Sequence, residues 1–80
     1  MHELGILYHI VEKVQKVVED NQLVEVEAIV LQVGEQSGVI PKYLHNCFPA
    51  AVDGTMMENT VLEVEEIRGR EFNLKEIRAR

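Results

Sequence analysis

The strongest constraint on the fold is a change of hydrophobic period near residue 22. From 23 to 33, apolar and polar residues alternate in steps of two, and the second half is apolar on both sides, as in a strand with neighbours. Before that point, apolar residues recur every three or four positions, a spacing typical of one face of a helix: Leu4, Leu7, Val11, Val14 and Val18, with Ile6, Ile10 and Val17 widening one side. The pattern predicts a helix over 4–20 and a strand over 23–33.

A second helix is predicted over 41–52. Pro41 suits the first turn of a helix, whereas Pro49 should kink or split it because an interior proline removes a hydrogen bond. The residues expected to point inward are Tyr43, Leu44, Cys47 and Phe48.

Alternation returns over 59–67 and 71–77, with only Arg68-Gly69-Arg70 between the two segments. Strands this close are typical of a hairpin, and Gly69 is free to take a positive φ. We therefore predict an α+β fold: an αβαββ two-layer domain in which a three-stranded antiparallel sheet carries two helices on one face.

The length of 80 residues permits one core, so we expect a single domain over 1–80. No apolar run approaches the roughly 18 residues of a membrane span, and no basic leader precedes a cleavage site. We therefore expect a soluble, cytoplasmic protein without a membrane partner. The single cysteine, Cys47, cannot form an internal disulfide or a cysteine-only zinc site, and we interpret it as a small buried hydrophobe.

Charge is distributed unevenly along the chain. Residues 1–67 have a net charge of −9, whereas residues 68–80 have a net charge of +3. An acidic body argues against nucleic acid as a partner. The basic end has two interpretations: an exposed edge strand guarded by Lys and Arg, or a docking strip for an acidic partner.

The chain starts with Met1-His2-Glu3, which offers a metal the terminal amine, the His2 peptide nitrogen and the His2 imidazole. Nitrogen donors in this tetragonal arrangement suit Ni(II) or Cu(II). The alternative for this stretch alone is a frayed polar terminus ahead of a helix. His9 and His45 are interpreted as surface residues, and no catalytic residue is predicted, because Cys47 and His45 would point to different sides of a helix.

Several motifs in order resemble the HypA/HybF nickel metallochaperones of hydrogenase maturation. The similarity covers nearly the whole chain, and the first and last motifs are the most specific. These motifs are Met1-His2-Glu3-Leu4, Val33-Gly34-Glu35, Ser37-Gly38-Val39, Gly54 ahead of a strand, and Gly69-Arg70-Glu71-Phe72-Asn73-Leu74-Lys75-Glu76-Ile77.

The resemblance implies a nickel site at Met1, His2 and Glu3, where all three positions match. It also implies delivery of nickel to [NiFe]-hydrogenase, or to urease in some members, with the maturation GTPase HypB and a hydrogenase precursor as partners. Such proteins normally carry a zinc-binding lobe with two Cys-x-x-Cys pairs. The lobe is inserted at the point that corresponds to residues 67–69 of this chain. This chain lacks that lobe, and therefore the zinc ligands.

Two alternatives remain at this stage. The first concerns function: a metal-free interaction or dimerisation module that uses the sheet edge and the basic end. The second concerns assembly. We favour a monomer, but if the residues on either side of Gly69 lay too far apart, the strand over 71–77 would join a second copy and give a strand-swapped dimer.

Overall fold

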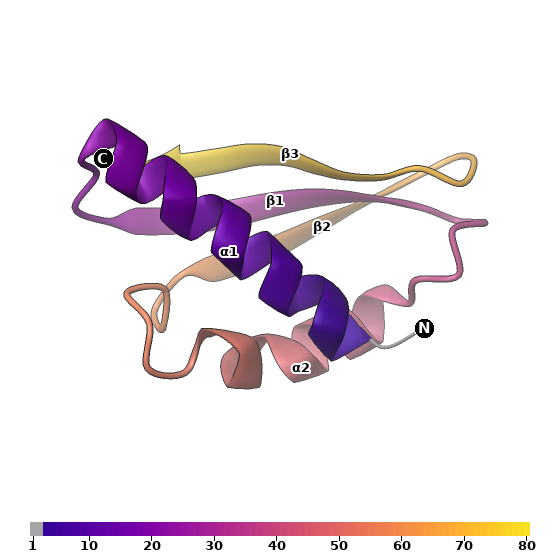
Figure 1. The fold of residues 1–80 in the computed structure, drawn as a ribbon. Helices are drawn as coiled ribbons and strands as arrows, with labels where there is room; N and C mark the ends of the chain where they lie inside the picture. The colour runs from indigo at the N-terminus through magenta and orange to yellow at the C-terminus, as the bar shows by residue number, and fades with distance from the viewer. Residues whose placement is uncertain (1–2) are drawn as a thin grey trace.

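The computed structural model describes residues 3–80, which form α1 (Glu3–Asn21), β1 (Val26–Gly34), α2 (Pro41–Val52), β2 (Val61–Ile67) and β3 (Phe72–Ala79). Both helices lie on one face of the three-stranded sheet (Figure 1), which confirms the predicted α+β class and the two-layer arrangement. Within residues 3–80, no helix has both the length and the apolar character that crossing a membrane requires.

The sheet is mixed, so the predicted antiparallel sheet is wrong. Its strand order is β2-β1-β3. β1 pairs in parallel with β2 and antiparallel with β3, and α2 provides the crossover that a parallel pair requires. The predicted hairpin between β2 and β3 is also wrong, because β1 lies between them.

The link over 68–71 carries the chain from β2 around the end of β1 to β3. Two backbone hydrogen bonds hold it there: the N–H groups of Gly34 and Gln36 donate to the carbonyls of Glu71 (2.7 Å) and Gly69 (2.8 Å). A third, from the N–H of Glu35 to the carbonyl of Ile67 (2.8 Å), holds the last residue of β2 beside them. Gly69 has a φ of +93°, as predicted. Two strand spacings are about 10 Å, and at roughly 3.3–3.6 Å per residue the link spans them. β3 therefore reaches the sheet of its own chain.

The core lies between the helices and one face of β1. Ile29, Leu31 and Val33 alternate along β1 toward this face and are almost fully buried. The predicted stripe of α1 packs against them, with Leu7, Ile10, Val11, Val14 and Val18 buried. β1 begins at Val26 rather than at residue 23, because α1 ends at Asn21 and Gln22, with a φ of +54°, turns the chain first.

α2 has the predicted bounds but differs in detail. Pro41 occupies its first turn and Pro49 lies inside it, yet the helix continues to Val52. Pro49 falls in the last turn and is exposed. The hydrogen bond lost with its missing N–H therefore weakens only the end of the helix. Leu44 and Phe48 are buried as predicted, whereas Tyr43 is 48% exposed and points outward, because the buried face is centred on Leu44, Phe48 and Ala51.

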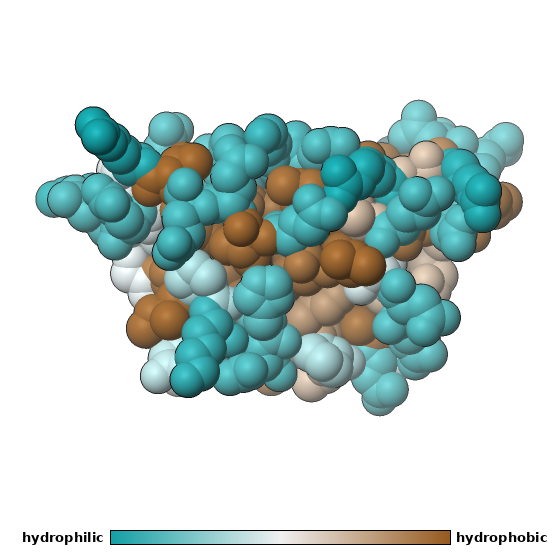
Figure 2. Space-filling model, turned by 180° about the vertical axis from the view of Figure 1, so that it is seen from behind, coloured by the Kyte–Doolittle hydropathy of each residue, from teal (hydrophilic) through white to brown (hydrophobic). Residues whose placement is uncertain are grey.

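On the face of the sheet opposite the helices, hydrophilic side chains lie around apolar ones (Figure 2). Ala28 and Val30 of β1 are buried there, although neither belongs to the core beneath the helices. Because β2 and β3 flank β1, paired side chains from these two strands meet above it, and these pairs are Glu63 with Arg78 and Glu65 with Lys75.

These contacts also account for most of the basic end. The Lys75 ammonium, 2.8 Å from the Glu65 carboxylate, lowers the pKa of Glu65 with help from the Gln32 amide, and the same contact raises the pKa of Lys75. Arg80 lies 2.5 Å from Glu25. With Arg78 bound to Glu63, three of the five cations are paired within the chain and do not form a free docking strip.

Candidate metal centre

Of the three predicted ligands, Met1 and His2 lie outside the described residues, and Glu3 is the first residue of α1. Its carboxylate, in the first turn, stabilises the positive end of the helix dipole. Glu3 is half-buried.

The Glu3 carboxylate also contacts the start of the other helix. Its Oε2 accepts a long hydrogen bond, 3.4 Å, from the N–H of Ile40. Ile40 is the N-cap residue of α2 and its side chain offers no acceptor for the helix. Glu3 thus supplies an acceptor from another part of the chain, and the first turns of α1 and α2 lie together at one end of the molecule (Figure 1).

Two helix N-termini that meet give this end a positive potential, since each carries partial positive charge on its free N–H groups. A cation is disfavoured at such a place unless anionic donors accompany it. The Glu3 carboxylate is one such donor, and deprotonated peptide nitrogens, which nickel accepts in tetragonal geometry, are others.

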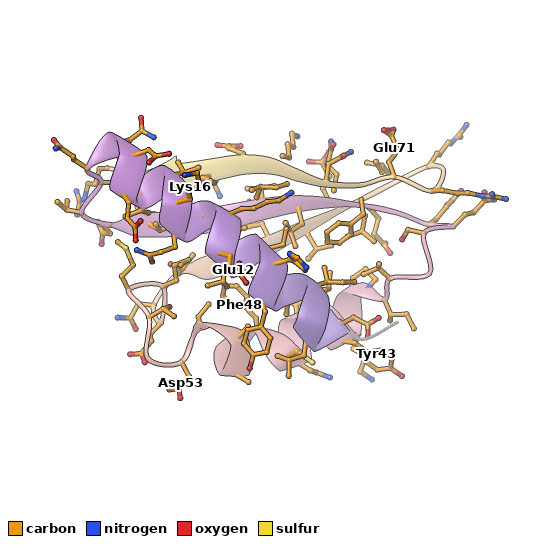
Figure 3. All side chains as sticks on the ribbon, viewed as in Figure 1. Glu12, Lys16, Tyr43, Phe48, Asp53 and Glu71 are labelled. Atoms are coloured by element: carbon orange, nitrogen blue, oxygen red, sulfur yellow. The ribbon has the colours of Figure 1, made fainter. Side chains whose placement is uncertain are left out.

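The remaining candidate ligands are separated. Within residues 3–80, no group of three or more His, Cys, Asp or Glu side chains could hold a metal ion. His9 and His45 are exposed on α1 and α2, as predicted. Cys47 is a free thiol, half-buried against the core. Figure 3 shows Tyr43 at the start of α2, at the same end of the molecule as the first turn of α1.

The sequence did not predict two features of the structure near α1. The contact between Glu3 and Ile40 joins residues far apart in sequence, and no periodic pattern reports it. The second is a hollow of about 270 Å³ lined by Ile6, His9, Ile10, Lys13, Phe72 and Leu74, between α1 and β3. In the sequence, the feature that could have indicated this hollow is the widening of the apolar stripe of α1 by Ile6 and Ile10.

Comparison with known proteins points to one family. The family profile described as hydrogenase/urease nickel incorporation, metallochaperone, HypA matches residues 1–77. The hydrogenase maturation factor HypA of Geobacter sulfurreducens is 37% identical over 70 residues, which cover 88% of this chain and 61% of that protein. The HypA of Streptomyces avermitilis is 35% identical over 71 residues, covering 88% and 54%. This chain thus spans little more than half of these relatives.

The fold is also found in a solved structure. The solution structure of the Ni metallochaperone HypA from Helicobacter pylori matches with a TM-score of 0.77 and covers 95% of this chain and 72% of that one. At 14% sequence identity, this likeness shows a shared fold.

Proposed function

We propose that this chain, which belongs to the HypA family of hydrogenase and urease nickel-incorporation metallochaperones, binds Ni(II) through Met1, His2 and Glu3 and passes it to another protein. A metallochaperone carries its metal as cargo and is not an enzyme. The observation that carries the proposal is that the Met1-His2-Glu3 start lies inside the matched residues 1–77. Its donors suit nickel, and Glu3 lies where two helix N-termini meet.

We further propose that the chain is the nickel-binding half of such a protein, a single domain over 1–80 without the zinc lobe. Two observations support this. The chain spans 54–61% of the length of the relatives compared above, and its one cysteine cannot supply two Cys-x-x-Cys pairs. The junction would fall near 67–69, where the link packs on the end of β1. Zinc is therefore not part of the proposal for this chain.

The proposed recipients follow from the family resemblance. They are the maturation GTPase HypB and, beyond it, a [NiFe]-hydrogenase precursor, with urease as a second destination, in a cytoplasmic pathway. A nickel titration on protein with an authentic Met1 terminus tests the first step. The expected result is one Ni(II) per chain at micromolar or tighter affinity, and the absence of binding would instead favour the metal-free interaction module.

Binding should weaken steeply as the pH falls from 8 to 6. Nickel must displace the proton of the terminal amine, whose unperturbed pKa is roughly 7.7–8.0, and further protons leave the peptide nitrogens. The deprotonated donors are thus available at high pH and are lost as the pH falls. Isothermal titration calorimetry at the two pH values measures the change.

The matched variant for this test carries an acetyl group on the Met1 amine. It keeps every side chain and every peptide nitrogen but removes the amine as a donor, so its affinity should drop at both pH values. Equal affinity in the acetylated and authentic proteins would rule out the amine as a ligand.

We also propose that the domain is a monomer. β3 pairs within its own chain, and the link over 68–71 accepts two hydrogen bonds from Gly34 and Gln36 at the end of β1, so no strand needs a second copy. Light scattering on dilute protein should give a mass near 9.1 kDa. A dimer that persists at low micromolar concentration would instead support strand exchange.

A further inference from the structure

The hollow between α1 and β3 lies beside a free sheet edge. β3 is an edge strand, with β1 on one side and no strand on the other within residues 3–80. All its apolar side chains on the helix face are only half-buried: Phe72, Leu74, Ile77 and Ala79. From the other wall, Ile6 and Ile10 of α1 complete the apolar lining. A helix that covered the whole strand would have buried these groups.

The free backbone groups of β3 lie at the same place. Gly34 donates to Glu71, which makes these two residues a hydrogen-bonded pair. Because such pairs alternate with non-bonded pairs along an antiparallel ladder, Val33 with Phe72 and Leu31 with Leu74 are non-bonded pairs in the register of β1 with β3. Phe72 and Leu74 therefore direct their N–H and C=O groups outward, and these same residues line the hollow.

The charges around the hollow indicate the chemistry of its occupant. Lys13 is the charged side chain in the lining, with His9 one turn before it, and neither pairs with a carboxylate of residues 3–80. The cations of β3 are committed to the opposite face, where Lys75 binds Glu65 and Arg78 binds Glu63. The helix side of this edge is therefore apolar with an unpaired positive rim.

A second copy fits this surface poorly. Two copies joined by antiparallel pairing of β3 about a two-fold axis would bring their α1 helices together and place Lys13 near its own equivalent. Each chain also has a net charge of −6, which opposes self-association. An acidic side chain from a partner would instead meet Lys13 at short range, where salt screens less than it does at long range.

We propose that the free edge of β3 and the adjoining hollow bind an extended segment of a partner protein, which adds a fourth strand to the sheet. On its side facing α1, that segment carries an apolar residue for the hollow and, two positions along, an acidic residue for Lys13. Main-chain hydrogen bonds to Phe72 and Leu74 provide affinity, and the two side chains provide specificity. Binding at this surface does not require nickel. The proposal can therefore be tested independently of the proposed metal site.

The test uses the acetylated and amidated peptide Thr-Leu-Thr-Glu-Thr-Leu-Thr, which places Leu, Glu and Leu on one side of a strand in either direction. Titrated into the isotopically labelled 80-residue chain, it should shift the amide resonances of Phe72, Leu74 and the α1 residues of the hollow. Lys13→Glu should weaken binding by about tenfold, because attraction becomes repulsion. The control Lys42→Glu, exposed on α2 and outside the hollow, should change it less than about twofold.

A charge swap completes the test. The same peptide with Lys in place of Glu should bind the Lys13→Glu variant better than the unmodified chain. No shifts along β3, or equal binding of both peptides by both proteins, would overturn the proposal. If the same resonances shift with protein concentration alone, the edge binds a second copy, and the proposed partner segment is wrong.

Discussion

Replacing Gly34 with alanine should lower the free energy of unfolding by about 2–4 kcal/mol, through overpacking and weakened hydrogen bonds. A Cβ at Gly34 would lie 2.4 Å from the Gly69 carbonyl oxygen and 2.8 Å from that of Glu71. Both are backbone atoms of the link between β2 and β3, so no side chain can rotate away. The link must move, and the hydrogen bonds that it accepts from Gly34 and Gln36 must lengthen.

Gly5→Ala is the matched control for this prediction. Gly5 is in α1, and a Cβ there meets nothing within 4 Å. The same added methyl group should therefore be neutral or should stabilise the chain by up to about 1 kcal/mol, since alanine favours a helix. Urea unfolding of both variants, followed by circular dichroism, measures the difference. Equal effects of the two substitutions would mean that the link does not pack on Gly34 as described.

Gly34 also shows what sequence reasoning could provide. Val33-Gly34-Glu35 was among the motifs that carried the family resemblance, but nothing in the local pattern explains why glycine is needed. The reason is a close approach by backbone from residues 69 and 71, far along the chain. Such a contact becomes visible only once the strand order is known.

The main error of the sequence-based prediction was the order of the strands in the sheet. Two alternating segments separated by three residues favour a hairpin because consecutive strands are usually neighbours. The competing signal was also present: a strand, a helix over 41–52 and another strand form the pattern of a parallel unit with a crossover. The apolar second half of β1 agrees with its central place, since Val30 and Leu31, on opposite faces, are both buried.

The helices were easier to predict because their signals are local. The three-to-four spacing located α1 within one residue at each end, and Pro41 marked the start of α2. Tyr43 was misplaced because a stripe read from a short helix leaves its centre uncertain by about one residue, which is roughly 100° around the axis. The predicted ligand Glu3 is the first residue of α1, and its bond to Ile40 could not be predicted because it depends on how the two helices pack.

His2→Ala should reduce nickel affinity by at least about 100-fold. Mutation of groups that only orient metal ligands typically costs 10–100-fold, and the His2 imidazole is proposed as a direct donor that the backbone cannot replace. The terminal amine and peptide nitrogens would remain, but a chelate without the imidazole has an open position that water must fill. The fold should be unaffected, because the substitution precedes α1 and its buried stripe.

The matched controls are His9→Ala and His45→Ala, which remove exposed imidazoles from α1 and α2. Each should bind nickel as the unmodified chain does, because neither residue is near enough in sequence to close a chelate ring with the terminal amine. Calorimetric titration of the three variants, all with an authentic Met1, gives the comparison. If His2→Ala keeps its nickel while either control loses it, the metal lies on a helix surface and the chain's first residues are not its site.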